Sequence, residues 1–266
     1  GELWAQPSAP YPLDAGGWLT GQIQDLQGRI NLNMLVHSRE GVQERTGSVS
    51  GTMSGGEKER WNSTQKMLIR LLQTLGEDSL SIDEAVILTE AISDFIDMDS
   101  ERRIHGAEDS DYRYSEFPYL PANRVLASVS ELRAVRGMTE PVYRALAPLV
   151  TVWPSSYGRL NILTAPLPVI RSLNADDQLE PLPLMEAQLL MDLRNDGGIN
   201  SIEELLAHPL LEGLDIASLK PLLGVRSEWF LLDATVQLLD RERHLFTVLN
   251  RREETSVAVF RSEGEL

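Results

Sequence analysis

TVQLLDRERHLFTVLNRREETSVAVFR, residues 235–261, is the stretch that decides the fold of this chain. Three apolar runs in and beside it, at residues 234–239, 244–249 and 256–261, are rich in β-branched and aromatic side chains. Short charged segments separate the runs, and this pattern predicts an antiparallel meander. Near the start of the chain, residues 17–36 alternate apolar and polar side chains, which predicts one or two further strands with a tight turn.

The sequence between these strands has helical periodicity. Residues 61–76 place apolar side chains three and four positions apart and end at a glycine, so they predict a first helix. Ser81 followed by Glu84 is a capping-box pattern, which predicts that a second helix begins there. Helical patterns interrupted by glycine and proline dominate residues 128–224.

Strands at both ends of a helical block predict an α+β fold. The simplest arrangement has an antiparallel sheet domain formed by residues 1–60 and 225–266. A large all-α domain, residues 61–224, would then be inserted into it. The chain has 266 residues, which is long enough to bury a sizeable core.

Charge and cysteine usage narrow the classes of function. The formal charge is −16 and the isoelectric point is about 4.7. Nucleic acids and anionic membrane surfaces attract lysine and arginine, so this charge argues against both as partners. The absence of cysteine excludes disulfides, thiol nucleophiles and cysteine-built metal sites. No apolar run approaches the roughly 20 residues of a membrane helix.

One acidic loop is the strongest candidate for a functional site. DFIDMDSERRIHGAEDSDYRY, residues 94–114, has seven carboxylates in its first eighteen residues and only two arginines. Counted from the first aspartate that follows the second helix, acids fall at positions 1, 3, 5 and 12. They are Asp97, Asp99, Glu101 and Glu108. These are side-chain ligand positions of the EF-hand calcium loop, but position 6 is Arg102 instead of the required glycine. A true EF-hand is therefore not expected.

The competing interpretation of this loop is a solvated acidic segment that its arginines partly neutralise. Four aromatic residues lie at or just after its end, and a disordered acidic linker seldom contains so many. They are Tyr112, Tyr114, Phe117 and Tyr119. The further acids in EDSD, residues 108–111, add oxygens for one or two Ca²⁺, each of which takes about 6–8 oxygen ligands. Magnesium is less expected than calcium, because it retains its water ligands. Zinc is less expected because His105 is the only histidine nearby. We therefore expect structural calcium.

Two functions from other classes compete with a structural protein. A metal-dependent hydrolase could use the acidic cluster, but the four histidines lie far apart and no other catalytic group is evident. Residues 130–150 and 201–225 resemble helix-hairpin-helix units, which can bind DNA phosphates. However, residues 176–215 carry ten acids and one arginine, a charge that repels DNA.

Several stretches together resemble the K-type minor pseudopilin (GspK) family of bacterial type II secretion systems. They are GGWLTGQIQDLQGRINLNMLV (16–36), the acidic loop (94–114), PYLPANRVLASVSELRAVRGMTEPVYRALAP (118–148), LNILTA (160–165) and the closing strands. The similarity runs over nearly the whole chain and in the same order. The family's usual prepilin leader, hydrophobic helix and most of its long first helix are absent. The resemblance therefore implies the periplasmic part of a protein anchored in the bacterial inner membrane through that helix.

The resemblance also implies a fold, partners and a role. The sheet domain would be pilin-like, and the helical insertion would cap the tip of a periplasmic pseudopilus and help to start its assembly for the export of folded proteins. I-type and J-type minor pseudopilins would be its partners, and the insertion would be available to secreted cargo or the outer-membrane channel. Family members bind calcium in the acidic loop. The corresponding residues here are Asp97, Asp99, Glu108, Asp109 and Asp111, with Glu101 and Asp94 as further candidates.

Overall fold

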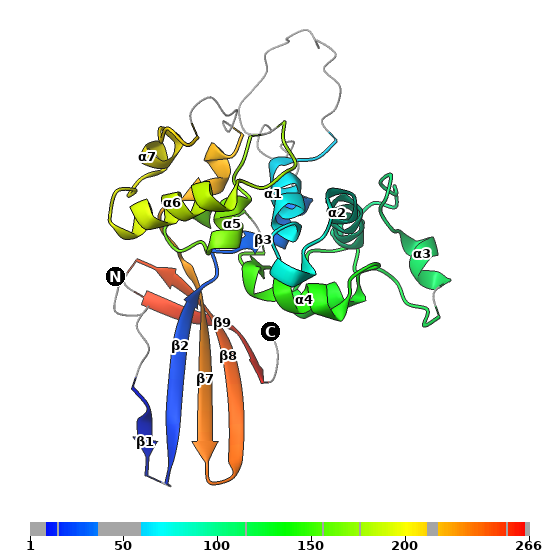
Figure 1. Ribbon diagram of the computed structural model, residues 1–266. Coiled ribbons are helices and arrows are strands. Elements are labelled where there is room, and N and C mark those ends of the chain that lie inside the picture. Colours follow the sequence, from blue (N-terminus) through cyan, green and yellow to red (C-terminus); the bar gives the residue numbers. More distant parts are fainter. Residues whose placement is uncertain are drawn as a thin grey trace, which may run out of the picture.

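The computed structural model describes residues 9–14, 16–36, 60–114, 116–155, 157–175, 177–211, 218–253 and 255–263. An extended sheet forms one end of the molecule, and a group of helices forms the other (Figure 1). The expected α+β fold is confirmed. None of the helices in the described part of the chain has both the length and the apolar composition needed to cross a membrane.

The principal sheet has five antiparallel strands in the order β1-β2-β7-β8-β9. The strands are β1 (Tyr11–Leu13), β2 (Gly17–Asp25), β7 (Trp229–Leu238), β8 (Arg241–Arg252) and β9 (Thr255–Glu263). The expected meander is formed by β7, β8 and β9. Strand β2 pairs with β7 along its whole length, so the two ends of the sequence form one sheet.

Four strands of two residues each lie outside this sheet and form two parallel pairs. They are β3 (Ile30–Asn31) with β4 (Val150–Thr151), and β5 (Leu160–Asn161) with β6 (Leu223–Gly224). Strand β3 therefore does not form a hairpin with β2 through the tight turn that residues 17–36 suggested. The segment after β2 instead enters the helical region, where Ile30, Leu32 and Leu35 belong to its core. Three of these short strands, β4, β5 and β6, lie within residues 61–224, which we expect from the sequence to be all-α.

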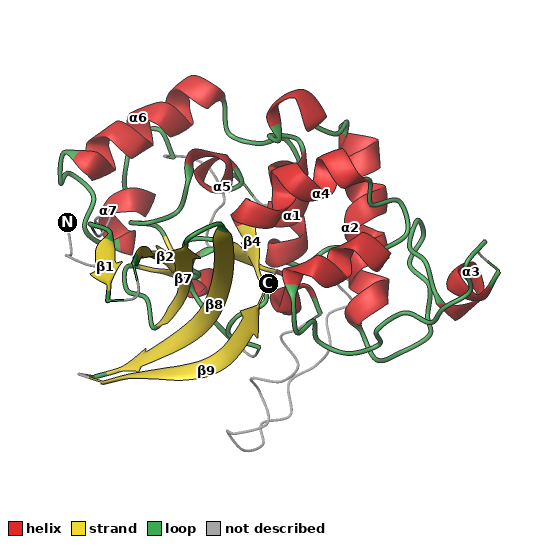
Figure 2. Ribbon diagram, turned by 90° about the horizontal axis from the view of Figure 1, so that it is seen from below, coloured by secondary structure: helices red, strands yellow, loops and turns green. Residues whose placement is uncertain are grey.

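The helical region contains seven α-helices among the described residues. They are α1 (Ser63–Leu72), α2 (Ile82–Ile96), α3 (Asp109–Arg113), α4 (Glu140–Leu146), α5 (Leu167–Arg171), α6 (Leu184–Asn195) and α7 (Ile202–Leu206). Both predicted N-terminal helices are present. The predicted capping box is formed by the Ser81 side chain, which accepts from the Glu84 N–H, and by the Glu84 carboxylate, which accepts from the Ser81 N–H. Helix α3 lies at the edge of this region (Figure 2).

One large hydrophobic core holds the helical region together. Helices α1 and α2 contribute much of it, including Leu68, Leu72 and Ile92, which are fully buried. A second, small cluster of Leu26, Leu231 and Val248 lies where the sheet meets the helical region. The sheet strands are more exposed toward the β7–β8 turn, at the end of the molecule far from the helices.

The Asp25 carboxylate, at the end of β2, links the two parts. Its Oδ2 accepts hydrogen bonds from Asn161 Nδ2 (3.1 Å), Thr164 Oγ1 (2.6 Å) and Ser227 Oγ (2.5 Å). Its Oδ1 accepts from the Gln27 N–H at 2.8 Å. The chain passes between the sheet and the helical region twice, near residues 25–27 and near residue 227. The Asp25 side chain joins these two segments.

Candidate metal centre

The acidic loop begins where α2 ends. Asp97 is the C-cap of the helix, and its N–H donates to the Ser93 carbonyl at 3.0 Å. The backbone of Asp97 is extended, so the chain leaves the helix axis and turns into the loop. The last turn of α2 also carries Asp94, which is fully buried. A rigid helix therefore supplies the first carboxylates of the site.

Two buried acids of α2 hold the loop against the helix. The Glu90 carboxylate accepts from the His105 N–H at 2.8 Å and from the Arg60 and Trp61 side chains. The Asp94 carboxylate accepts from the backbone N–H of Arg103 at 3.1 Å and from its guanidinium. These contacts fix residues 103–105, which lie between the two groups of acids.

Gly106 permits this close approach of loop and helix. A Cβ atom at this position would lie only 1.8 Å from Asp94 Oδ2. Real Cβ atoms do not approach another heavy atom so closely, so a residue with a side chain would force the loop away from α2. The close contact brings the loop back toward the helix just before Glu108.

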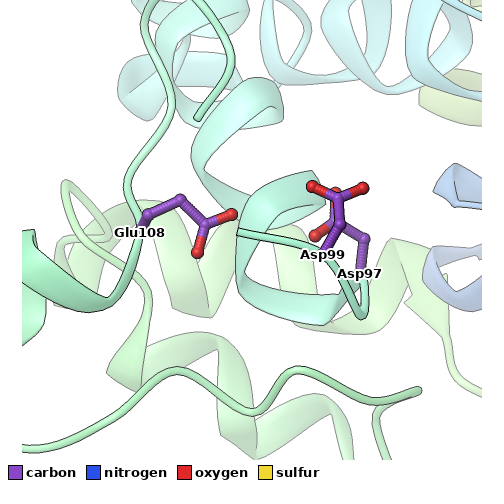
Figure 3. Close-up of side chains that lie close together, drawn as sticks. All are labelled: Asp97, Asp99 and Glu108. Atoms are coloured by element: carbon purple, nitrogen blue, oxygen red, sulfur yellow. The ribbon is translucent and has the colours of Figure 1, made fainter. Parts of the chain in front are cut away.

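Three carboxylates converge at this point. One oxygen from each of Asp97, Asp99 and Glu108 lies within 4.8 Å of the other two. Figure 3 shows Glu108 reaching from its loop toward the two aspartates that follow α2. Asp99 is exposed, whereas Asp97 and Glu108 are only 8% and 5% exposed. The group is therefore open to solvent on one side and buried on the other.

The buried oxygens of this group lack donors. Backbone N–H groups at the start of α3 lie near the Glu108 carboxylate, but neither of its oxygens accepts a well-formed hydrogen bond, and neither does Asp97 Oδ1. The other oxygen of Asp97 is 2.6 Å from the Arg103 guanidinium, which also contacts Asp94. Arg103 thus contacts two of the three buried acids, and Glu108 is not one of them. Unpaired buried carboxylates are costly, so the protein alone leaves this cluster undercompensated.

The pKa shifts express the same imbalance. Burial, reinforced by the charges of Asp94 and Asp97, raises the pKa of Glu108 to about 7. Burial also raises the pKa of Asp94 and of Asp97, although Arg103 opposes both shifts. In the protein alone these carboxyl groups resist ionisation. A bound cation would stabilise their ionised form.

This donor set fits a calcium ion. Calcium takes oxygen ligands at about 2.3–2.6 Å, so two ligands on one ion are at most about 5 Å apart. The three carboxylates satisfy that limit, and their unpaired oxygens supply the required chemistry. Asp97, Asp99 and Glu108 would hold the ion, and the exposed side near Asp99 leaves room for water ligands.

The other predicted ligands lie outside this group. Glu101 is exposed, and its N–H donates to Asp99 Oδ1 at 2.8 Å. Asp109 pairs with Arg113 of the same short helix at 3.2 Å. Asp111 contacts Arg136 and Arg102, and it accepts from the Glu108 N–H at 3.1 Å. Asp94 is committed to Arg103.

Sequence reasoning missed the roles of Arg103 and Glu90. The sequence presents Arg103 as one of two arginines that partly neutralise an acidic loop, whereas in the structure its guanidinium lies between Asp94 and Asp97. Glu90 has the helical spacing of a buried position, four residues before Asp94, but a charged residue in an apolar stripe does not reveal its partners. His105 contacts Glu90 through its backbone, which no side-chain pattern could indicate.

Comparisons with known proteins give one consistent result. Two family models described as "Type II secretion system (T2SS), protein K" match residues 28–155 and 160–226. Among curated proteins, type II secretion system protein K of Pectobacterium carotovorum is 30% identical, over 99% of this chain and 75% of that protein. The protein of the same name from Pseudomonas aeruginosa is 31% identical, over 97% of this chain and 68% of that protein.

A solved structure agrees over nearly the whole chain. It is the crystal structure of the GspK-GspI-GspJ complex of the type 2 secretion system from enterotoxigenic Escherichia coli. The matched chain has a TM-score of 0.73 and 25% sequence identity, and the match covers 99% of this chain and 85% of that one.

Proposed function

This chain belongs to the type II secretion system protein K family, and we propose that it is a minor pseudopilin that caps the tip of a periplasmic pseudopilus. In this role it would help to start assembly of the fibre that serves the export of folded proteins. The observation that carries the proposal is the fold match over 99% of the chain, which includes both the sheet and the helical region.

The shape of the molecule supports a position at a fibre end. The helical region is bulky and lies at one end of a narrower sheet (Figure 1). Subunits that follow one another in a fibre must present matching surfaces at both ends. A large addition at one end removes that match, so such a subunit terminates the fibre on that side. The proposed location is the periplasm, with the bulky end directed away from the inner membrane.

We propose I-type and J-type minor pseudopilins as partners. The matched structure is that of a complex with GspI and GspJ. The test is to mix the purified chain with the periplasmic parts of the I-type and J-type proteins of the same organism and to measure the mass of the product by light scattering after gel filtration. A complex with one copy of each chain is expected. Separate elution of this chain at micromolar concentrations would contradict the proposal.

We propose that the loop holds structural calcium. Support comes from the unpaired oxygens of Asp97 and Glu108 and from the convergence of these residues with Asp99. One ion accounts for this group. The expectation of a second ion rests on Asp109 and Asp111, which are engaged with arginines here. Elemental analysis after equilibrium dialysis against 2 mM calcium, with the dialysate as the blank, would give the number bound.

The two competing functions gain no support from the family. The members of the matched family are components of a secretion system. Neither a hydrolase nor a nucleic-acid-binding protein is among the named relatives. The proposed role is structural, with no reaction assigned to the acidic cluster.

A further inference from the structure

A second candidate site lies at the junction of the sheet and the helical region, remote from the acidic loop in sequence. A cleft of about 440 Å³ opens there. Its lining comes from the segments that follow β2 and β4, from the first residue of α7, from β6 and the residues that follow it, and from the first residue of β7. This volume falls within the range of about 300–1,000 Å³ that is common for ligand clefts, which often lie at such junctions.

Two arginines give the cleft a charge opposite to that of the whole chain. Arg159 and Arg226 both line it and are exposed. No ion pair or side-chain hydrogen bond joins either guanidinium to the described residues. Most other arginines of the helical region pair with acids, as Arg103 and Arg136 do. Glu228 is the one acid among the lining residues, so the cleft is basic in a chain of charge −16.

Apart from Gln27 and Glu228, the remaining lining residues are apolar, aromatic or glycine. Pro154, Tyr157 and Trp229 form part of the wall. The Tyr157 hydroxyl donates to the Pro221 carbonyl, which fixes the ring at the rim. Gly158, which is half-buried, and the buried Gly224 complete this part of the lining.

A small inner pocket of about 30 Å³ continues the cleft toward the core and shares Pro154, Gly158 and Arg159 with it. Trp153 lines this inner pocket, and its indole N–H is buried without an acceptor. Arg29 also lines it and donates to the Gln24 side chain. Buried donors without partners are uncommon in native structures. An occupant of the inner pocket could supply the acceptor that the Trp153 indole N–H lacks.

We propose that this junction cleft, defined by Arg159, Arg226, Tyr157 and Trp229, binds an acidic peptide segment of a partner protein. The two arginines would pair with carboxylates on either side of an apolar residue, which would lie against the aromatic wall. Charge complementarity selects the occupant, because the cleft presents two unpaired guanidinium groups and apolar surface together. The inference does not depend on the proposed tip position.

The test uses the whole chain and a fluorescein-labelled hexapeptide of alternating glutamate and leucine, followed by fluorescence anisotropy at low salt. The control peptide has glutamine in place of glutamate. Saturable binding below about 1 mM is expected for the acidic peptide only. Arg159→Gln and Arg226→Gln should each weaken binding about threefold, and the double variant about tenfold. Because the probe is synthetic, the result is independent of whether the I-type and J-type proteins bind.

The matched control is Arg243→Gln, which removes the same charge from an exposed arginine of β8 near the far end of the sheet. It should leave affinity unchanged, and all variants should melt as the parent does. Equal binding of the neutral peptide, equal loss in Arg243→Gln, or no saturable binding would overturn the proposal. The proposal would also be overturned if inorganic phosphate, at the same concentration of charge as the peptide, displaced the peptide. That result would indicate a general anion site.

Discussion

Glu108 is the residue on which the calcium proposal depends most directly. Replacement by glutamine keeps the shape of the side chain and removes the charge that burial disfavours. Glu108→Gln should therefore melt at a higher temperature than the parent in EGTA at pH 8. It should also lose the rise in melting temperature that 2 mM calcium gives the parent. For a site with Kd near 10⁻⁴ M that rise corresponds to about 2 kcal/mol.

Glu101→Gln is the control for this experiment, because Glu101 is an acid of the same loop that lies outside the converging group. Its melting temperature should keep the full response to calcium. Magnesium at the same concentration should have little effect on either protein. If Glu101→Gln abolished the calcium response and Glu108→Gln did not, the ligand set drawn from the geometry would be wrong.

The raised pKa of Glu108 predicts a pH dependence of stability in the absence of metal. The folded state keeps its proton up to a pKa of about 7, whereas the unfolded state loses it near 4.5. Between these values the folded state binds more protons, so the free energy of unfolding decreases as pH rises. The raised pKa values of Asp94 and Asp97 act in the same direction. Melts in EGTA from pH 5 to pH 8 should show falling stability, and Glu108→Gln should flatten the curve.

Calcium should reverse part of this trend, because the ion favours the ionised carboxylates. In 2 mM calcium the melting temperature should change less between pH 6 and pH 8 than it does in EGTA. Proton release on calcium addition at pH 6.5, measured in two buffers of different ionisation enthalpy, gives an independent check. Identical pH profiles with and without calcium would argue against ligation by Glu108.

Gly106 provides a steric test of the loop position. Gly106→Ala would place a methyl group on Asp94 Oδ2, so loop and helix must separate. The expected loss is about 1–3 kcal/mol in the free energy of unfolding, measured by urea denaturation. Gly21→Ala is the matched control in the sheet, since its Cβ would lie at an ordinary 3.6 Å from Leu232 Cδ1. Equal stability of the Gly106 variant and the parent would show that the loop does not lie against α2 as described.

At the scale of secondary-structure elements, the Asp25 carboxylate determines how β2 meets the helical region. Asp25→Ala leaves the donors of Asn161, Thr164 and Ser227 without their shared acceptor. The expected loss is about 2–3 kcal/mol in urea denaturation, because several partly buried donors lose their partner together. Asp240→Ala, in the exposed β7–β8 turn, should change stability little. A similar small effect at Asp25 would mean that apolar packing alone fixes the junction.

The elements also differ in how far the sequence predicts them. The start of α2 depends on Ser81 and Glu84, three residues apart, so a local pattern suffices. The meander was recognisable because long strands alternate over many residues. Strands β3 and β4 are two residues long and pair across more than a hundred positions, so they leave no periodic signal. Their pairing follows from the core that surrounds them.

For the candidate site, too, the sequence predicts what depends on local spacing and does not predict what depends on distant contacts. Asp97, Asp99 and Glu108 could be predicted as a group because a calcium loop is a local motif with fixed spacing. Glu101 fits the spacing equally well, yet its side chain is exposed. Arg136 engages Asp111 from 25 residues away, a contact that depends on the tertiary fold. Local spacing thus identifies candidates, and tertiary contacts decide which carboxylates remain unpaired.

At the scale of the whole molecule, the acidic loop and the five-stranded sheet lie at different places, and no residue of that sheet belongs to the converging group. Calcium should therefore act on the stability of the helical region more than on that of the sheet. In EGTA at 10 °C, well below unfolding, the Glu108→Gln protein should still form the complex with the I-type and J-type partners. Addition of 2 mM calcium should raise the dissociation temperature of the parent complex and leave that of the variant complex unchanged, because only the parent gains stability from the ion. Failure of the variant to assemble even in the cold would instead place the loop at a partner interface. Gel filtration at both temperatures distinguishes these outcomes.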